Sequence, residues 1–299
     1  MPHAKANGLE IYYETHGDPS GAPLLLIMGL GAQMSRWSPQ LIGELTAAGH
    51  RVIAFDNRDV GLSEKLDAAG APDMGAVMAA VREGKPAPVA YTLEDMAADA
   101  AGLLDALGVK RAHIVGASMG GMIAQLVAAD FPQKTLSLTS IMSTTGNPNL
   151  PRATPEAMAR LSTPSPDPNT DLEGFLASAV EGAKVMGSKY PPDEAQVRAQ
   201  SLADYQRSYY PVGFQRQYAG IMASPDRRPK LRTITAPTVV IHGEDDPLVP
   251  LAGGRDTAQN IPGAELRIVP GVGHEMPEPV RGEFVAGILA AVRRARVTA

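Results

Sequence analysis

The sequence has no cysteine among its 299 residues. Disulfide bonds, thiolate metal sites and a cysteine nucleophile are therefore excluded. The longest hydrophobic run, around residues 24–30, falls far short of the roughly 18 residues that a membrane span needs. The first residues lack a charged region followed by an apolar stretch, so we expect no signal peptide. These absences predict a soluble, cytoplasmic protein without a membrane span.

Positive charge is also scarce. The 27 Lys and Arg residues are outnumbered by 32 Asp and Glu residues, which gives a formal net charge of −5. Because no cluster of basic residues stands out, we expect no nucleic acid partner. The six histidines show no spacing typical of metal ligands, so no metal site is expected.

What the sequence does have is an alternation of strand-like and helix-like segments. Runs of aliphatic and β-branched residues, typical of buried parallel strands, occupy residues 23–29, 51–56, 112–117, 136–142, 238–243 and 265–270. Residues 9–14 alternate apolar with polar side chains and predict an antiparallel edge strand. This order predicts an α/β fold with a mostly parallel central sheet flanked by helices.

The clearest helical pattern follows Thr92, whose hydroxyl can cap the amide of Asp95, and it ends at Gly108. Its apolar residues form one stripe, which predicts that this side of the helix packs on the sheet. The acidic residues outside the stripe, Asp95, Asp99 and Asp105, are predicted to face water.

One long stretch, residues 146–232, interrupts the alternation because it contains no convincing strand. Pro, Ser, Asp and Asn crowd its first part, and helical patterns follow at 171–185, 193–210 and 213–223. Much of the aromatic content of the chain gathers here. The stretch is either an insertion that buries its own aromatics or a helical cap over the carboxyl ends of the strands. Ligands bind at that edge of α/β sheets, and long insertions there form lids, which favours the cap.

We therefore predict an α/β core made of residues 1–145 and 233–299, with residues 146–232 as an inserted helical cap. The candidate pocket-lining side chains of the cap are Tyr209, Tyr210, Phe214 and Tyr218. Trp37, the only tryptophan, is another candidate for the pocket border, with a place in the core as the alternative.

The segment HIVGASMGG places Ser118 between Gly116 and Gly120, after a predicted strand and before a helix rich in small residues. A plain turn is one interpretation, but a nucleophile elbow requires this order of elements. The glycines leave room for a strained turn that exposes the hydroxyl. Since a free hydroxyl is a poor nucleophile at neutral pH, such a serine needs a base.

His274 and His242 are the histidines best placed to act as that base. His274 lies in a loop between the last predicted strand and the last helix, and it fits the chain order Ser, Asp, His. His242 ends a strand and is predicted to pack beneath the turn that follows. The acid is expected among Glu244, Asp245 and Asp246. Asp246 is favoured because the proline after it restricts its backbone.

Together, the elbow, the acidic loop and the final Gly-x-Gly-His resemble the α/β-hydrolase fold with a Ser-His-Asp triad, over nearly the whole chain. The acidic loop matches that family's G-x-x-D-x-x-x-P pattern. The stretch DNRDVGLS resembles the family's Asp-x-Arg-Gly-x-Gly-x-Ser loop, with Asp59 in place of the first of those glycines. With LLLIMGLG, this loop is most similar to the aclacinomycin methylesterase group of small esterases.

The resemblance implies an oxyanion hole formed by the backbone N–H groups of Met119 and Leu30. Most family members have His-Gly after the third strand, where this sequence has Met28-Gly29. Because the oxyanion hole uses backbone donors, we interpret this exchange as local repacking.

The function implied is hydrolysis of a small-molecule carboxylic ester through an acyl-enzyme, with no cofactor. Ser118 attacks the ester, His274 carries the proton and Asp246 orients the histidine. The same triad also serves acyltransferases and the cofactor-free haloperoxidases, which form peracids. A non-catalytic protein that binds a small molecule is an alternative of a different class. The sequence leaves the natural ester and the oligomeric state open.

Overall fold

A central β-sheet organises the computed structural model, which describes residues 2–187 and 189–297. In this part of the chain the sheet has eight strands in the order β1-β2-β4-β3-β5-β6-β7-β8. The strands are β1 (His3–Ala6), β2 (Leu9–His16), β3 (Ala22–Ile27), β4 (His50–Phe55), β5 (Ala112–Ala117), β6 (Thr135–Ile141), β7 (Thr238–Gly243) and β8 (Glu265–Val269). Strands β1 and β2 are antiparallel to their neighbours and the others are parallel. The predicted α/β fold is confirmed.

One strand prediction is wrong in its position. Residues 9–14 form part of β2, but β1 pairs with β2 on its outer side, so β2 is not the edge of the sheet. The sequence of β1, HAKA, has no apolar run that would have indicated a strand. It is held by antiparallel pairing, with His3 opposite Tyr12.

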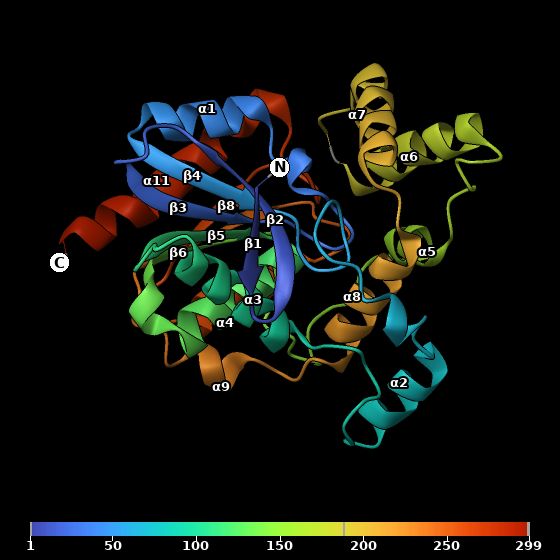
Figure 1. Cartoon of the computed structure of the whole chain (residues 1–299), viewed down its shortest axis with the longest axis horizontal. Coiled ribbons are helices and arrows are strands. Elements are labelled where there is room, and N and C mark those ends of the chain that lie inside the picture. Colours follow the sequence, from blue (N-terminus) through green and yellow to red (C-terminus); the bar gives the residue numbers. More distant parts are fainter. Residues whose placement is uncertain (1, 188, 298–299) are drawn as a thin grey trace.

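Helices cover both faces of the sheet (Figure 1). On one face lie α1 (Pro39–Ala47) and α11 (Arg281–Val297), and on the other lie α3 (Leu93–Ala106) and α4 (Met119–Asp130). The strands supply apolar side chains to both layers because alternate residues point to opposite faces. In β3, for example, Leu24 belongs to the core under α1 and α11, whereas Leu25 belongs to the core under α3 and α4. Helix α10 (Leu251–Asn260) packs against β7 and β8.

Helix α3 begins as its sequence predicts. The Thr92 hydroxyl accepts a hydrogen bond from Asp95 N–H, and the Asp95 carboxylate accepts one from Thr92 N–H, which forms a capping box. The prediction that Asp99 faces water is wrong, because its side chain is buried against Arg58. The Arg58 guanidinium contacts both Asp99 carboxylate oxygens at 2.6 Å. Burial nevertheless keeps the pKa of Asp99 above its ordinary value, despite this partner.

The inserted segment, residues 146–232, has no strand in its described part and lies beside the sheet (Figure 1). Its helices are α5 (Pro155–Ser162), α6 (Leu172–Met186), α7 (Glu194–Arg207), α8 (Pro211–Ala223) and α9 (Arg228–Leu231). Helix α5 falls in the stretch rich in Pro and Ser and was not predicted. Thr154 caps it and Pro155 occupies its first position, so these residues start a helix here. Helix α2 (Met74–Arg82) lies outside the inserted segment and contacts α8.

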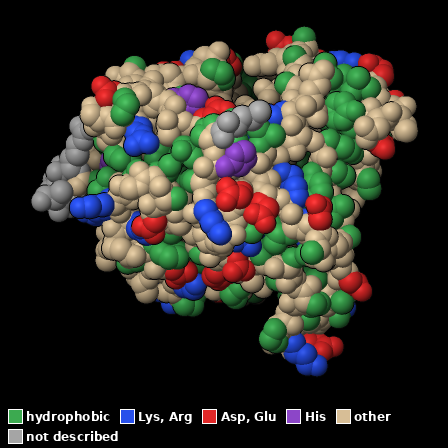
Figure 2. Space-filling view, viewed as in Figure 1, with side chains coloured by type: hydrophobic (Ala, Val, Ile, Leu, Met, Phe, Trp, Pro, Cys, Tyr) green, Lys and Arg blue, Asp and Glu red, His purple; other side chains and the backbone are tan. Residues whose placement is uncertain are grey.

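Four short 3₁₀ turns complete the described secondary structure: η1 (Met34–Arg36), η2 (Asp67–Ala69), η3 (Pro132–Lys134) and η4 (Glu278–Val280). Among the described helices, none has both the length and the apolar character to cross a membrane. On the face drawn in Figure 2, Lys and Arg side chains are interspersed with acidic ones over the described residues.

Candidate active site

Ser118 occupies a sharp turn between β5 and α4. Its backbone has φ 56° and ψ −120°, a conformation that costs a non-glycine residue free energy. Two glycines make the turn possible: a Cβ on Gly116 would lie 2.0 Å from Gly120 O, and one on Gly120 would lie 2.1 Å from Ile27 O. The turn is held by a hydrogen bond from Ser118 N–H to Ile141 O at 2.9 Å. The Ser118 side chain thereby reaches the cavity at the carboxyl edge of the sheet.

Three side chains named from the sequence lie in one hydrogen-bonded row. His274 Nε2 is 2.9 Å from Ser118 Oγ, and His274 Nδ1 is 2.7 Å from Asp246 Oδ2. When Nδ1–H donates to the carboxylate, Nε2 is left as an acceptor for the serine hydroxyl. This is the geometry that a serine nucleophile and its base require.

The acidic loop after β7 distinguishes its three carboxylates. Asp246 is buried, and its Oδ1 accepts hydrogen bonds from Leu248 N–H at 2.9 Å and Val249 N–H at 2.8 Å. Its Oδ2 is the atom that meets His274. Glu244 and Asp245 are exposed. The loop therefore presents a single carboxylate to the histidine.

His242 lies beneath this loop, as predicted, and is completely buried. Its Nε2 is 2.7 Å from Val249 O and 3.6 Å from Asp246 Oδ2. Burial lowers the pKa of His242, an effect only partly opposed by the Val249 carbonyl and by Asp246. The ring is thus held neutral and tied to the acidic loop, whereas His274 contacts the serine.

The loop after β3 passes directly over Ser118. A Cβ added to Gly29 would lie 3.2 Å from the Ser118 Cβ, so only a short distance separates the loop from the nucleophile elbow. Leu30 lines the cavity beside it. Met119 is the first residue of α4, where backbone N–H groups have no partner within the helix. Both residues named as oxyanion donors therefore lie next to Ser118.

One cavity adjoins the row, and a second cavity adjoins the first. The inner cavity, about 400 Å³, contains Ser118 and His274 and is bordered by Tyr218. Seven methionines line it: Met28, Met119, Met122, Met142, Met158, Met222 and Met276. The outer cavity, about 850 Å³, shares Leu30, Ala32 and Leu161 with the inner one. Its aromatic lining consists of Phe175, Tyr205, Tyr209, Tyr210 and Phe214. The four predicted cap aromatics thus border one cavity or the other.

The prediction that Trp37 borders the pocket is wrong. Its side chain is only 1% exposed and belongs to the core on the α1 and α11 side of the sheet, with Met34 and Leu41. It is absent from the lining of both cavities. The core alternative is the correct one: Trp37 lies two residues before α1 and packs in the same core cluster as Leu41 of that helix.

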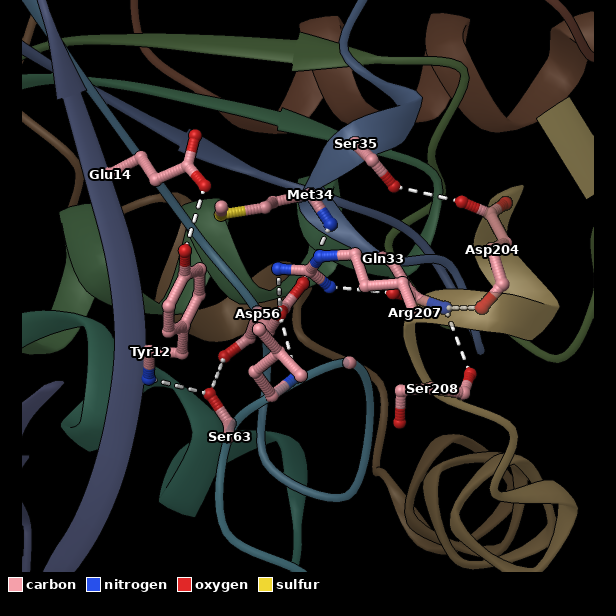
Figure 3. Close-up of polar contacts among 12 residues, drawn as sticks. Tyr12, Glu14, Gln33, Met34, Ser35, Asp56, Ser63, Asp204, Arg207 and Ser208 are labelled. Atoms are coloured by element: carbon pink, nitrogen blue, oxygen red, sulfur yellow. Dashed lines mark hydrogen bonds and ion pairs between the residues drawn. The ribbon is translucent and has the colours of Figure 1, made fainter. Parts of the chain in front are cut away.

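The inserted segment is tied to the loop after β4 by two ion pairs. Arg207 of α7 contacts Asp56, with Nη2 2.8 Å from Oδ2 (Figure 3). Arg216 of α8 contacts both carboxylate oxygens of Asp59 at 2.8 Å. Burial alone would raise the pKa of Asp59, but the guanidinium and the Leu66 N–H hold it below its ordinary value.

Asp59 has a positive φ of 67°, so the position where the family usually has glycine keeps a glycine-like backbone. The sequence marks Asp59 as a departure from the family pattern, but it gives no sign that Arg216 pairs with Asp59 or that Arg207 pairs with Asp56. Those contacts join residues more than 150 positions apart.

In the described residues, no group of three or more His, Asp or Glu side chains is arranged to hold a metal ion. The arrangement offers a hydroxyl beside an imidazole, with backbone N–H groups next to both.

Residues 22–278 match the family of the alpha/beta hydrolase fold, and the chain belongs to that family. It is similar to the rhodomycin D methylesterase DauP of Streptomyces sp. (strain C5), at 30% identity over 319 aligned residues that cover 96% of each protein. It also resembles the putative carbamate hydrolase RutD of Variovorax paradoxus (strain S110), at 30% identity over 89% of this chain and 90% of RutD. The crystal structure of the enol-lactonase from Burkholderia xenovorans LB400 shares the fold, with a TM-score of 0.72, 22% identity and coverage of 98% and 100%.

Proposed function

We propose that the protein is a serine hydrolase of carboxylic esters. The observation that carries this proposal is the row Ser118–His274–Asp246, with contacts of 2.9 and 2.7 Å at the wall of an apolar cavity. Ser118 Oγ attacks the ester carbonyl while His274 Nε2 takes its proton. His274 then protonates the leaving alcohol, and later activates the water that releases the acyl group. Asp246 holds the imidazole tautomer and stabilises the imidazolium.

The oxyanion that forms in each step is stabilised by backbone N–H groups, which we assign to Met119 and Leu30. The positive end of α4 points at the same place, since α4 begins directly after Ser118. Donors placed where negative charge develops supply much of the rate enhancement in acyl transfer.

For the substrate, we propose a small-alcohol ester, such as a methyl ester, carried on a bulky and largely apolar molecule. The name of the similar DauP, a methylesterase, supports the alcohol part. The outer cavity of about 850 Å³ with its aromatic lining supports the bulky part. On this proposal residues 146–232 are a cap that forms the outer cavity, on a core of residues 1–145 and 233–299.

The test is the variant Ser118→Ala. Because the triad acts as a unit, we expect kcat/KM for p-nitrophenyl and methyl esters to fall by about 10⁵-fold or more, with unchanged circular dichroism and Tm. Ser20→Ala, an exposed serine in a turn, is the matched control and should retain full activity. Activity of Ser118→Ala within tenfold of the wild type contradicts the proposal.

A fluorophosphonate probe separates the remaining alternatives. The wild type should be labelled at Ser118 and should release acid and alcohol in equal amounts. Labelling without turnover of any ester would indicate a binding protein that has kept the site. Product formation that depends on an added alcohol or on peroxide would indicate acyl transfer or peracid formation.

A further inference from the structure

Gln217 of α8 is a completely buried glutamine that joins the cap to two loops of the core. Its Oε1 accepts a hydrogen bond from Gly31 N–H at 2.8 Å, and its Nε2 donates one to Arg58 O at 2.8 Å. Both polar atoms of this buried amide are hydrogen-bonded. Loss of either hydrogen bond would leave a buried polar group unsatisfied, so the amide restrains the positions of its two partners. Neither the triad nor the ion pairs of the cap include this side chain.

Gly31 belongs to a tight turn that contains the proposed oxyanion donor. Ala32 N–H donates to Gly29 O at 3.2 Å, which closes a four-residue turn with Leu30 and Gly31 in its middle. Gly31 has φ 65°, as the third residue of a type II turn requires. A Cβ on Gly31 would lie 2.6 Å from the Phe214 ring, so α8 also packs against the turn.

The orientation of Leu30 N–H follows from these contacts. Leu30 N–H shares a planar peptide with Gly29 O, which is fixed by the bond from Ala32 N–H. The next peptide, between Leu30 and Gly31, is the one that can flip in such a turn, and its N–H is held by Gln217. With both peptides fixed, Leu30 N–H keeps one direction.

The same loop is held a second time, by α7. Gln33 Nε2 donates to Asp204 O at 2.7 Å and to Ser208 O at 3.0 Å, and Arg207 Nη1 donates to Gln33 Oε1 at 2.5 Å (Figure 3). This second attachment lies two residues beyond Gly31. It keeps the loop docked on the cap but leaves the middle peptide of the turn to Gln217.

We propose that Gln217 is a positioning residue for the oxyanion hole: its side-chain amide fixes the Gly29–Ala32 turn so that Leu30 N–H faces the tetrahedral intermediate on Ser118. The proposal rests on the proposed function. It makes the cap a part of the catalytic geometry, because a side chain of the cap sets a backbone donor of the core.

The experiment compares the wild type with Gln217→Met, which keeps the length of the side chain and removes both hydrogen bonds. We expect kcat for p-nitrophenyl acetate to fall by about 10- to 100-fold, with KM within threefold, because a misplaced donor weakens binding of the transition state more than of the ester. Affinity for benzeneboronic acid, whose adduct on Ser118 places an oxygen in the oxyanion hole, should fall by a similar factor. Gln196→Met, an exposed glutamine of α7, is the matched control.

A folded Gln217→Met enzyme with kcat and boronic acid affinity within twofold of the wild type overturns the proposal. The proposal is also overturned if the loss of kcat disappears after the rates are normalised to the concentration of active sites. That concentration is measured by titration with a fluorophosphonate, which labels only folded enzyme. Gln217→Glu provides a second test if Gln217→Met does not fold. It keeps an acceptor for Gly31 N–H, so we expect kcat within about tenfold of the wild type; a folded enzyme with a loss above a hundredfold overturns the proposal. Ester hydrolysis that depends on Ser118 leaves the proposed function standing in each of these cases.

Discussion

At the scale of single residues, the two oxygens of Asp246 have separate partners. Oδ1 accepts from two backbone N–H groups of its own loop, whereas Oδ2 meets the imidazole of His274. The hydrogen bonds to Oδ1 hold the shape of the loop, and the contact of Oδ2 with His274 orients the base. An asparagine can keep the first role through its carbonyl oxygen, but its amide nitrogen cannot accept the proton of His274 Nδ1.

We therefore expect Asp246→Asn to fold normally and to lose roughly 10⁴-fold in kcat, because the imidazole can adopt the wrong tautomer. Asp245→Asn is the matched control: its side chain is exposed and should change kcat by less than about threefold. Steady-state kinetics with one ester, together with thermal unfolding, makes the comparison. If Asp245→Asn were the inactive variant, the acid would have to be reassigned.

His242 makes a separate prediction about pH and stability. Because burial lowers its pKa in the folded protein, the unfolded chain takes up a proton on His242 at a pH where the folded protein does not. The free energy of unfolding should therefore decrease as the pH falls below about 6.5, by at most about 1.4 kcal/mol per pH unit from this group.

His242→Gln removes this titration and keeps a donor for Val249 O. Asp246 and His274, the groups that act electrostatically on His242, are present in both proteins. Urea unfolding between pH 8 and pH 5 should show that the wild type loses more stability than the variant. Parallel curves would mean that His242 titrates alike in the folded and unfolded states.

At the scale of elements, α8 carries a buried ion pair that joins the inserted segment to the loop after β4. Arg216 and Asp59, with side chains 1% and 0% exposed, form a bidentate pair between α8 and the loop after β4. Removing one partner of a buried pair leaves an uncompensated charge, which costs about 3–5 kcal/mol.

A double-mutant cycle tests this attachment. We expect Arg216→Met and Asp59→Asn each to lower the free energy of unfolding by about 3 kcal/mol or more. The free energy of unfolding of the double variant should exceed the value expected from adding the two single losses, by about 1 kcal/mol or more, because no unpaired charge remains. Asparagine suits the second change because it tolerates the positive φ at position 59. Additive effects in urea unfolding would show that the pair is not coupled.

The elements differ in how well the sequence predicts them. Strands β5 and β7 match their predicted ranges because each contains a short run of aliphatic residues, as buried parallel strands do. Strand β1 was missed because its four residues contain no aliphatic run. Helix α5 was missed because the Pro, Ser and Asp residues around it indicate a loop, although its own eight residues are amphipathic. Asp99 was misplaced for a related reason: periodicity records which side of α3 is apolar, but it carries no information on Arg58 reaching that helix from a distant loop.

At the scale of the whole molecule, the free energy of local unfolding is expected to differ between the helices of the inserted segment. Helix α8 buries Gly213, Arg216, Gln217, Ala219 and Gly220, whereas α7 buries only Ser201 among its residues. Segments with few buried contacts open locally at a lower cost than the global free energy of unfolding.

Hydrogen exchange tests this difference. Amides of α8 should exchange only with global unfolding, at the same free energy as those of β5. Amides of α7 should exchange through a smaller opening and with a weaker dependence on denaturant. Equal protection in the two helices would show that the cap behaves as one unit.

The candidate site was predictable where chemistry imposes a local pattern. Ser118, Asp246 and His274 each follow a strand, in an order and with flanking glycines and prolines that the turn geometry demands. Gln217, Arg207 and Arg216 have no such pattern, because their partners are chosen by the packing of distant segments. Trp37 shows the same limit, since a lone tryptophan near a pocket loop gives no sign of which side of the loop it packs on.

The methionine lining of the inner cavity bears on the peracid alternative. Seven methionines border the space that contains the Ser118 hydroxyl. Peracids and peroxide oxidise the thioether of methionine to a sulfoxide. Sulfoxides are polar, so this oxidation would make the apolar lining of the cavity polar. An enzyme that released peracid into this cavity would oxidise its own methionines during turnover. Ester hydrolysis generates no oxidant. The methionines around Ser118 therefore favour water over peroxide as the second substrate.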